Sequence, residues 1–145
     1  MRYFKRCMIQ KVIVTFNSKS HYFAFNESET FSITYPRSEE VEKTIPMTSS
    51  RFRHTSSIIR ANFSTKILIA GGYDGSPMDS GDVYDNKIEA FYPVNNSMTN
   101  RREFHTATVL PSGHVIIAGG CKNDGDCLDN LVLYNSRLHC FITLQ

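Results

Sequence analysis

The chain has 145 residues, of which 41% are hydrophobic and 12% aromatic, enough apolar material for one folded domain. Sixteen Lys and Arg against fourteen Asp and Glu give a net charge of +2. Because no basic run is longer than the two residues of Arg101-Arg102, we expect neither nucleic acid nor an anionic membrane as a partner.

The N-terminus is basic, but Gln10 and Lys11 interrupt its apolar stretch before it reaches the length of a signal-peptide core. No segment approaches the roughly 18 apolar residues of a membrane span. We therefore expect a cytoplasmic location. Secretion is the alternative, because Asn-x-Ser triplets begin at Asn26, Asn62 and Asn95.

Residues 11–16 and 21–25 are short alternating runs joined by a polar turn, which predicts a β-hairpin. Residues 31–35 and 41–44 add two further strands. Residues 1–50 are thus predicted to form one four-stranded unit, degenerate in sequence compared with the two units that follow.

The second predicted unit covers residues 51–101. Residues 55–59 and 66–70 form a hairpin of apolar and β-branched strands that ends in Gly71-Gly72. A loop rich in Asp and Gly follows, then a predicted third strand over 87–92 that ends in a tyrosine. A fourth strand is expected near residues 98–99.

The third predicted unit, residues 102–145, repeats the second after about fifty residues, a period typical of stacked supersecondary units. Its strands are predicted at 106–110, 115–118, 130–134 and 140–144. Four short antiparallel strands per repeat are typical of propeller blades. The predicted fold class is therefore all-β, an incomplete β-propeller of four-stranded antiparallel blades.

Both clear units contain a histidine before the first strand, His54 or His105, and a diglycine after the second. A residue repeated at one place in each unit favours a packing or hydrogen-bonding role. The diglycines favour a sharp turn or a close approach of chains. A phosphate site would require a following Lys-Ser or Lys-Thr pair and a helix N-terminus, and the sequence predicts neither.

Four cysteines stand at positions 7, 121, 127 and 140, without the spacing of a zinc site. We expect free thiols in a reducing compartment; the alternative is a disulfide between Cys121 and Cys127, which bracket a loop short enough for one in an oxidising compartment. The acidic loops after the diglycines do not follow the EF-hand order, and no hydrolase motif occurs. We expect no enzyme activity, no metal and no cofactor.

The pattern of Arg51-x-x-His54-Thr55, a strand ending in Gly71-Gly72 and a tyrosine at Tyr92 resembles the kelch repeat of galactose-oxidase-like propellers. The same features recur at Arg102, Gly119-Gly120 and Tyr134. Kelch blades commonly carry a Trp in strand four, and this chain has none. Phe141 holds that place in the last unit, and Met98-Thr99 in the one before.

The resemblance implies a ring of more blades than this chain supplies, since propellers close with about four to eight. An open arc would expose strand edges and blade faces. The remaining blades are expected from a longer chain, of which this is a fragment or a truncated product, or from self-association.

The kelch resemblance also implies that ligands bind on the loops after the diglycine and before the first strand. Those positions are Arg53, Tyr73, Phe104 and Cys121. The expected function is a protein-interaction module, a scaffold or adaptor that binds a protein or peptide. The alternative is part of a secreted galactose-oxidase-like protein that binds carbohydrate or is a copper-dependent oxidase.

Overall fold

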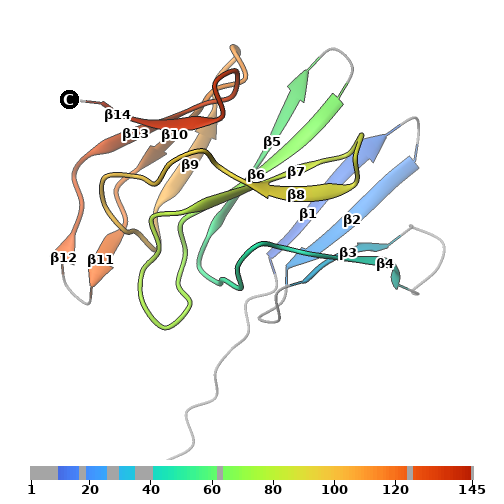
Figure 1. Ribbon diagram of the computed structural model, residues 1–145, viewed down its shortest axis with the longest axis horizontal. Helices are drawn as coiled ribbons and strands as arrows, with labels where there is room; N and C mark the ends of the chain where they lie inside the picture. Colours follow the sequence, from blue (N-terminus) through green and yellow to red (C-terminus); the bar gives the residue numbers. More distant parts are fainter. Residues whose placement is uncertain are drawn as a thin grey trace, which may run out of the picture.

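The computed structural model describes the backbone of residues 10–16, 19–25, 30–34, 41–61, 64–123 and 126–144, and the side chains of residues 45–60, 64–123 and 126–144. Its main elements are three four-stranded antiparallel sheets (Figure 1). The predicted fold class is confirmed: the chain is all-β, with the four-stranded sheets of a partial β-propeller. The described residues include no helix long and apolar enough to cross a bilayer.

The first sheet contains four strands in sequence order: β1 (Gln10–Phe16), β2 (Lys19–Phe25), β3 (Thr30–Thr34) and β4 (Val41–Pro46). Each strand overlaps a segment that the alternating sequence predicts as a strand. The predicted boundary of this unit, 1–50, remains a prediction, because residues 1–9, 17–18, 26–29 and 35–40 lie outside the described residues.

The second sheet also follows sequence order, with β5 (Thr55–Ala61), β6 (Ser64–Ala70), β7 (Gly81–Asp85) and β8 (Ala90–Pro93). The third consists of β9 (Thr106–Val109), β10 (Val115–Ala118), β13 (Leu131–Asn135) and β14 (Cys140–Leu144). A separate two-stranded ribbon, β11 (Cys121–Asn123) and β12 (Asp126–Cys127), lies in the chain between β10 and β13.

The third and fourth strands of the second sheet differ from the prediction. The third strand is Gly81–Asp85, and the segment predicted for it contains a turn and the fourth strand. Residues 98–99 form no strand. The two turns share one local cause: Asp85 Oδ1 accepts from Lys87 N (2.9 Å), and Asn135 Oδ1 accepts from Arg137 N (3.0 Å).

That pair of turns aligns Tyr84, not Tyr92, with Tyr134 of the third sheet. Tyr84 and Tyr134 are both buried, each at the next-to-last residue of its strand, whereas Tyr92 lies on β8. By the same alignment Phe91 on β8 corresponds to Phe141 on β14, and Met98 is a buried residue of the following loop.

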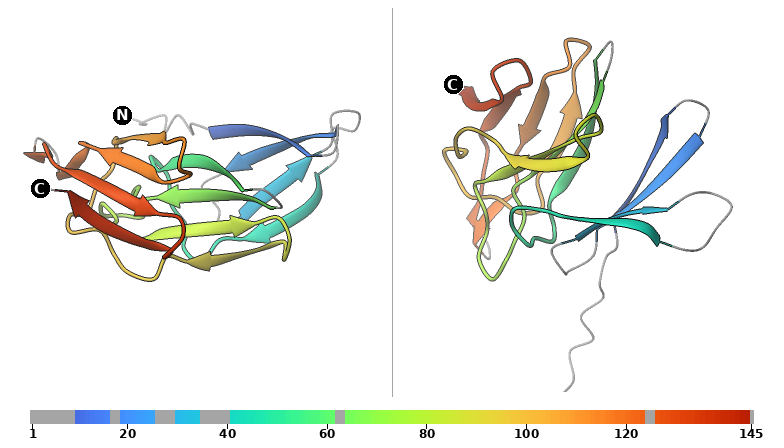
Figure 2. Two further views of the ribbon diagram at one scale, coloured as in Figure 1. Left: turned by 90° about the horizontal axis from the view of Figure 1, so that it is seen from above. Right: turned by 45° about the vertical axis from the view of Figure 1, so that its right-hand side comes forward.

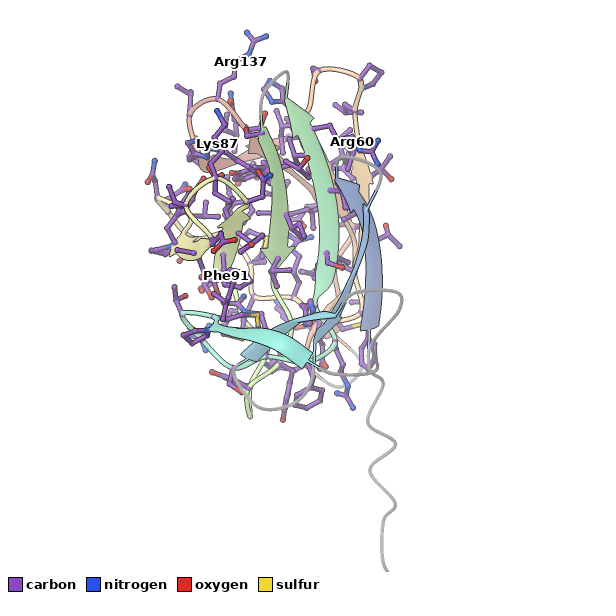
Figure 3. All side chains as sticks on the ribbon, turned by 90° about the vertical axis from the view of Figure 1, so that its right-hand side faces the viewer. Arg60, Lys87, Phe91 and Arg137 are labelled. Carbon is purple, nitrogen blue, oxygen red and sulfur yellow. The ribbon has the colours of Figure 1, made fainter. Side chains whose placement is uncertain are left out.

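Among the described side chains, buried apolar residues form two clusters, each between two neighbouring sheets, and we call these clusters seams. Figure 2 shows the three sheets between which they lie. One face of the second sheet, with Leu68 and Val83, packs on Ile117 and Val132 of the third. Its other face, with Ile67, Ile69 and Tyr84, packs against Ile45 and Met47 at the end of the first. Phe91 lies beside β4 on that second seam (Figure 3). The central sheet is therefore covered on both faces, which explains the continuous buried apolar run of residues 67–70 on β6.

The pairing of β5 with β6 and of β9 with β10 brings the candidate loops to one end of the sheets. Thr55 pairs with Ala70, and Thr106 pairs with Ala118, so each first strand begins where its second strand ends. The Arg-x-x-His segments and the diglycines consequently lie at the same end (Figure 1).

Candidate functional site

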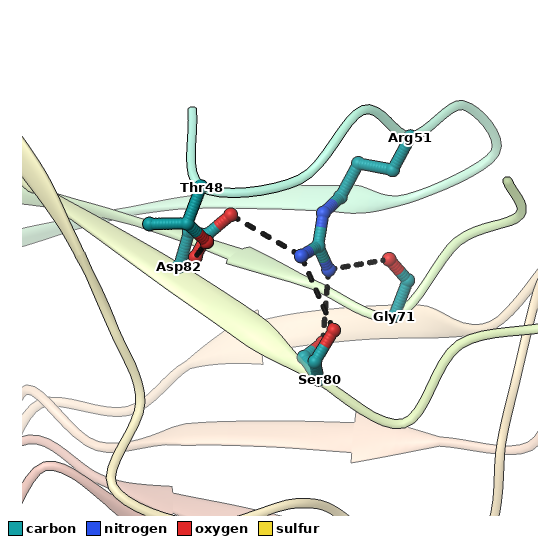
Figure 4. Close-up of polar contacts among 5 residues, drawn as sticks. All are labelled: Thr48, Arg51, Gly71, Ser80 and Asp82. Atoms are coloured by element: carbon teal, nitrogen blue, oxygen red, sulfur yellow. Dashed lines mark hydrogen bonds and ion pairs between the residues drawn. The ribbon is translucent and has the colours of Figure 1, made fainter. Parts of the chain in front are cut away.

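A buried arginine holds the loop before β5 in place. The guanidinium of Arg51, 1% exposed, donates to the carbonyl oxygens of Gly71 and Ser80, each at 3.0 Å (Figure 4). It also donates at 3.2 Å to Asp82 Oδ2, which makes this a buried ion pair, and the Thr48 hydroxyl donates to the same carboxylate. Arg51 therefore ties the loop to the ends of β6 and β7.

Arg102 holds the equivalent loop before β9 in the same way, but its hydrogen-bond partners are uncharged. Its guanidinium donates to Gly119 O at 2.9 Å and to Asn130 Oδ1 at 2.8 Å. In the register of the third sheet, Leu131 lies where Gly81 lies in the second, so no carboxylate follows at the place of Asp82. Burial lowers the pKa of both guanidinium groups, of Arg51 despite the attraction of Asp82.

Arg51 and Arg102 each fix a loop, and the residues that follow them in these two loops contact one another between the second and third sheets. Arg53 Nη1 donates to Glu103 Oε2 at 2.7 Å. The guanidinium carbon of Arg53 lies 4.5 Å from the centre of the Phe104 ring, 5.2 Å from Phe52 and 5.5 Å from Tyr73. We call these five residues the Arg53 cluster. Cations over aromatic rings at such distances are attracted by the ring quadrupole.

The backbone of the cluster is in an uncommon conformation at two equivalent places. Arg53 and Phe104 both have a φ of 56°, in the left-handed region that non-glycine residues seldom occupy. The Arg53 side chain is 39% exposed and Phe104 is 59% exposed, while the Glu103 side chain is 4% exposed. Strained backbone of this kind collects at functional sites, where packing elsewhere maintains it.

Three of the four predicted site residues, Arg53, Tyr73 and Phe104, thus come together. The fourth, Cys121, adjoins them: its backbone exchanges two hydrogen bonds with Glu103, of 2.9 and 3.0 Å. Tyr73 exchanges the equivalent pair with Phe52, of 2.8 and 3.0 Å. That these four residues bind a ligand remains a prediction.

Sequence reasoning missed Phe52 and Glu103, the other two members of the cluster. They hold the same place in successive repeats, one residue after the buried arginine. The available signal for a contact between units was a pair of opposite charges: Arg53 in the second unit and Glu103 in the third, each within two residues of the buried arginine of its unit. Its use would have required knowing that these loops adjoin.

His54 and His105 are both buried, and His105 contacts the neighbouring sheet. His105 Nε2 shares a hydrogen bond of 2.8 Å with the Thr55 hydroxyl, and a Cβ on Gly71 would lie 2.7 Å from His105 Cε1. Burial, together with the nearby charge of Arg102, lowers the pKa of His105 to about 4. Burial and Arg51 do the same for His54, also to about 4. Both imidazoles are therefore neutral at pH 7.

A hollow of about 520 Å³ lies at the end of the sheets opposite to the Arg53 cluster, between the β5–β6 hairpin and the turns after β9 and β13. Arg60 and Arg137 are among its lining residues and are found near that end in Figure 3. Lys66, which also lines it, pairs with Asp85 at 3.5 Å and donates to the Tyr92 hydroxyl at 3.1 Å. None of the predicted site residues lines this hollow.

The fold is similar to part of a known enzyme. A fungal alcohol oxidase of the AA5 family, described in complex with copper, matches 88% of this chain with a TM-score of 0.56 and 17% sequence identity. The chain shares the fold of part of an alcohol oxidase. It covers 27% of that protein. No family model matches the sequence, and no curated protein matches it.

This comparison corrects one expectation and supports another. The expectation of no enzyme activity is wrong, because the similar structure is that of an alcohol oxidase. The alternative, a galactose-oxidase-like protein, agrees with the comparison because the AA5 oxidase belongs to that family and has a kelch-like propeller. The adaptor function gains no support from it.

Proposed function

We propose that the chain forms three blades of an alcohol-oxidase-like β-propeller and that the Arg53 cluster binds an alcohol or a sugar. The observation that carries the proposal is the contact of Arg53 with Glu103 and Phe104, which joins two successive sheets at the end where their loops gather. The similarity to the fungal oxidase supports the choice of ligand class.

The chemistry of the cluster suits a hydroxylated ligand with an apolar face. Phe104 presents a largely exposed ring on which the C–H face of a sugar or the carbon chain of an alcohol packs. Arg53 carries five donors, and Glu103 offers lone pairs beyond the one used by Arg53, so hydroxyl groups can bind through charge-assisted hydrogen bonds. The left-handed backbone of Arg53 and Phe104 fixes the position of their side chains before binding, which lowers the entropic cost of binding a ligand.

The described residues do not fit a copper centre. Among them, no three His, Cys, Asp or Glu side chains gather closely enough to hold a metal ion. The two buried imidazoles fit it no better, since His105 is hydrogen-bonded to Thr55 across the seam. We therefore assign ligand binding to these blades and no step of oxidation.

The outward face of the third sheet is suited to a further blade. From the strand register, this open face comprises Thr106, Thr108, Ile116, Ala118, Leu131, Leu133, Ile142 and Leu144. The equivalent face of the second sheet is buried by the third, with Leu68 at 1% and Val83 at 0% exposed, whereas Leu131 is 40% and Ile142 38% exposed. We propose that the remaining propeller blades cover it.

The proposal is tested by titrating the ¹⁵N-labelled chain with galactose, glycerol and benzyl alcohol and following the amide signals of Arg53, Glu103 and Phe104. Phe104→Ala should weaken binding about tenfold, as expected for loss of a stacking ring worth about 1.4 kcal/mol. Arg137→Ala, at the opposite end of the sheets, is the matched control and should bind as the unchanged chain does.

Two outcomes would overturn the proposal: no shift of these amides by any alcohol or sugar, or equal affinity of the Phe104→Ala variant. Capture of a peptide by the same residues, with no response to sugars, would instead favour the protein-interaction function that the sequence first suggested.

A further inference from the structure

The two cysteines that bracket the loop after the second diglycine face each other in the structure. β11 and β12 form an antiparallel ribbon (Figure 1), and Cys121 is the direct cross-strand partner of Cys127. Residues directly opposite in antiparallel strands have Cα atoms about 4.5 or 5.5 Å apart and side chains on the same face. Both separations fall within the range that a disulfide spans.

Both sulfurs are present as free thiols, and both are accessible. Cys127 is exposed and Cys121 half-buried. Hydrogen bonding to the Cys127 thiol, followed by burial and the charges of Cys127, Glu103 and Asp126, raises the pKa of Cys121 to about 11. Cys121 therefore stays protonated at neutral pH, and the more exposed Cys127 is the first to react.

The ribbon is joined directly to the Arg53 cluster. Cys121 N donates to Glu103 O at 2.9 Å, and Glu103 N donates to Cys121 O at 3.0 Å. After β12, Leu128 N donates to Gly120 O at 2.7 Å. Fixing one strand of the ribbon on the other therefore also fixes the backbone beside Glu103, whose carboxylate holds Arg53.

We propose that Cys121 and Cys127 form a reversible dithiol–disulfide pair, oxidised by a small disulfide such as glutathione disulfide, that controls the order of the β11–β12 ribbon beside the Arg53 cluster. The proposal does not depend on what the cluster binds. It requires only the cross-strand position of the two thiols and the contact of Cys121 with Glu103.

The exchange proceeds in two balanced steps. The Cys127 thiolate attacks one sulfur of glutathione disulfide, the S–S bond breaks, and one glutathione thiolate leaves. Cys121, after losing its proton to water, attacks Cys127 Sγ and releases the second glutathione. Two electrons and two protons thus pass from the protein to glutathione, and excess reduced glutathione reverses both steps.

The test equilibrates the whole chain in glutathione redox buffers and measures intact mass, thiol number and cysteine-containing peptides. We expect a loss of about 2 Da, the mass of two hydrogens, and a peptide that links Cys121 to Cys127. Hydrogen exchange of the Glu103, Cys121 and Leu128 amides should slow about tenfold on oxidation, since the closed ribbon restricts local opening.

Two single variants separate this pair from the other thiols. Cys140→Ser, on β14, should oxidise as the unchanged chain does, whereas Cys127→Ser should lose both the link and the slowed exchange. Since Cys7 lies outside the described residues, peptide mapping must show that it takes no part. A lasting glutathione adduct, a link to Cys7 or Cys140, a dimer joined through cysteine, or unreacted thiols would each overturn the proposal.

Discussion

His105 of the third sheet shares a hydrogen bond of 2.8 Å with Thr55 of the second, and Thr55 is the residue that follows the second sheet's own histidine, His54. The histidine of one repeat is thus bonded to the threonine of the preceding repeat. In this pair of repeats, a dipeptide that looks like a local motif contributes a contact between successive sheets. Its imidazole is buried and neutral, and so has consequences for stability at low pH.

The chain should lose stability steeply between pH 6.5 and 4. Folding lowers the pKa of His54 and of His105 from 6.5 to about 4, so the unfolded chain binds more protons throughout this window. Stability from the neutral imidazoles is present above the unfolded pKa and is lost as the pH falls. From pH 7.5 to 5, each histidine should cost about 2 kcal/mol.

Urea unfolding at a series of pH values measures this loss. His105→Gln removes one titrating group, so the free energy of unfolding of this variant should depend on pH about half as strongly. The variant should also be less stable than the unchanged chain at pH 7.5. A free energy of unfolding that stays constant from pH 7.5 to 5 would show that the imidazoles are not held neutral.

Gly71 and Gly119 hold the same place in successive sheets but differ in what lies beside them. Their φ values are 57° and 63°, so alanine should suffer similar backbone strain at each. A Cβ at Gly71 would also lie 2.7 Å from Arg102 O and His105 Cε1, whereas at Gly119 its nearest neighbour is Leu128 O at 3.4 Å. Gly71→Ala should therefore destabilise the chain by at least about 2 kcal/mol more than Gly119→Ala.

Chemical denaturation of the two variants gives this difference directly. Equal losses would mean that the contact between the second and third sheets at Gly71 relaxes without cost. If further blades are supplied, the difference should shrink, because the neighbour that covers Gly71 would then have an equivalent beside Gly119.

Most strands could be predicted because the repeat combines short alternating runs with turn residues whose conformational preferences are local. The error in the second sheet came from aligning tyrosines: Tyr92 resembles Tyr134 by its following turn, yet Tyr84 is the true equivalent. Gly81–Asp85 was missed because Asp82 is polar for a buried strand. Its burial follows only from the ion pair with Arg51, which no local pattern reveals.

The candidate site could be predicted only in part, for a related reason. Arg53, Tyr73 and Phe104 follow from their places in the repeat, one unit at a time. The pairing of Arg53 with Glu103 depends on how successive sheets pack and on the αL backbone at two loops, and neither is encoded within a single unit. Contacts between repeats therefore need the structure.

Arg51 and Arg102 should differ in how much stability they provide. Arg51→Met leaves the Asp82 carboxylate, 1% exposed, with only the Thr48 hydroxyl among its described partners, and should cost about 3–5 kcal/mol. Arg102→Met leaves a carbonyl and an amide oxygen, and should cost about 1–3 kcal/mol.

Equilibrium unfolding in urea at pH 7.5 compares the two arginine variants. In the Arg51→Met background, Asp82→Asn should restore part of the loss by removing the buried charge. No recovery, or a larger loss from Arg102→Met, would show that the ion pair with Asp82 is not the source of the difference.

The open face of the third sheet should make the chain associate at high concentration, since exposed apolar sheet faces seek a partner. The double variant Leu131→Lys with Ile142→Lys places two charges on that face, and light scattering should then report a monomer. Its free energy of unfolding should change by less than about 1 kcal/mol because both side chains are partly exposed.

The matched control, Ile88→Lys with Leu138→Lys, charges two residues that are 63% exposed on turns outside the face and should leave association unchanged. If both double variants reduce association equally, net charge and not this face governs association. The proposal that a further blade packs on the open face would then be wrong.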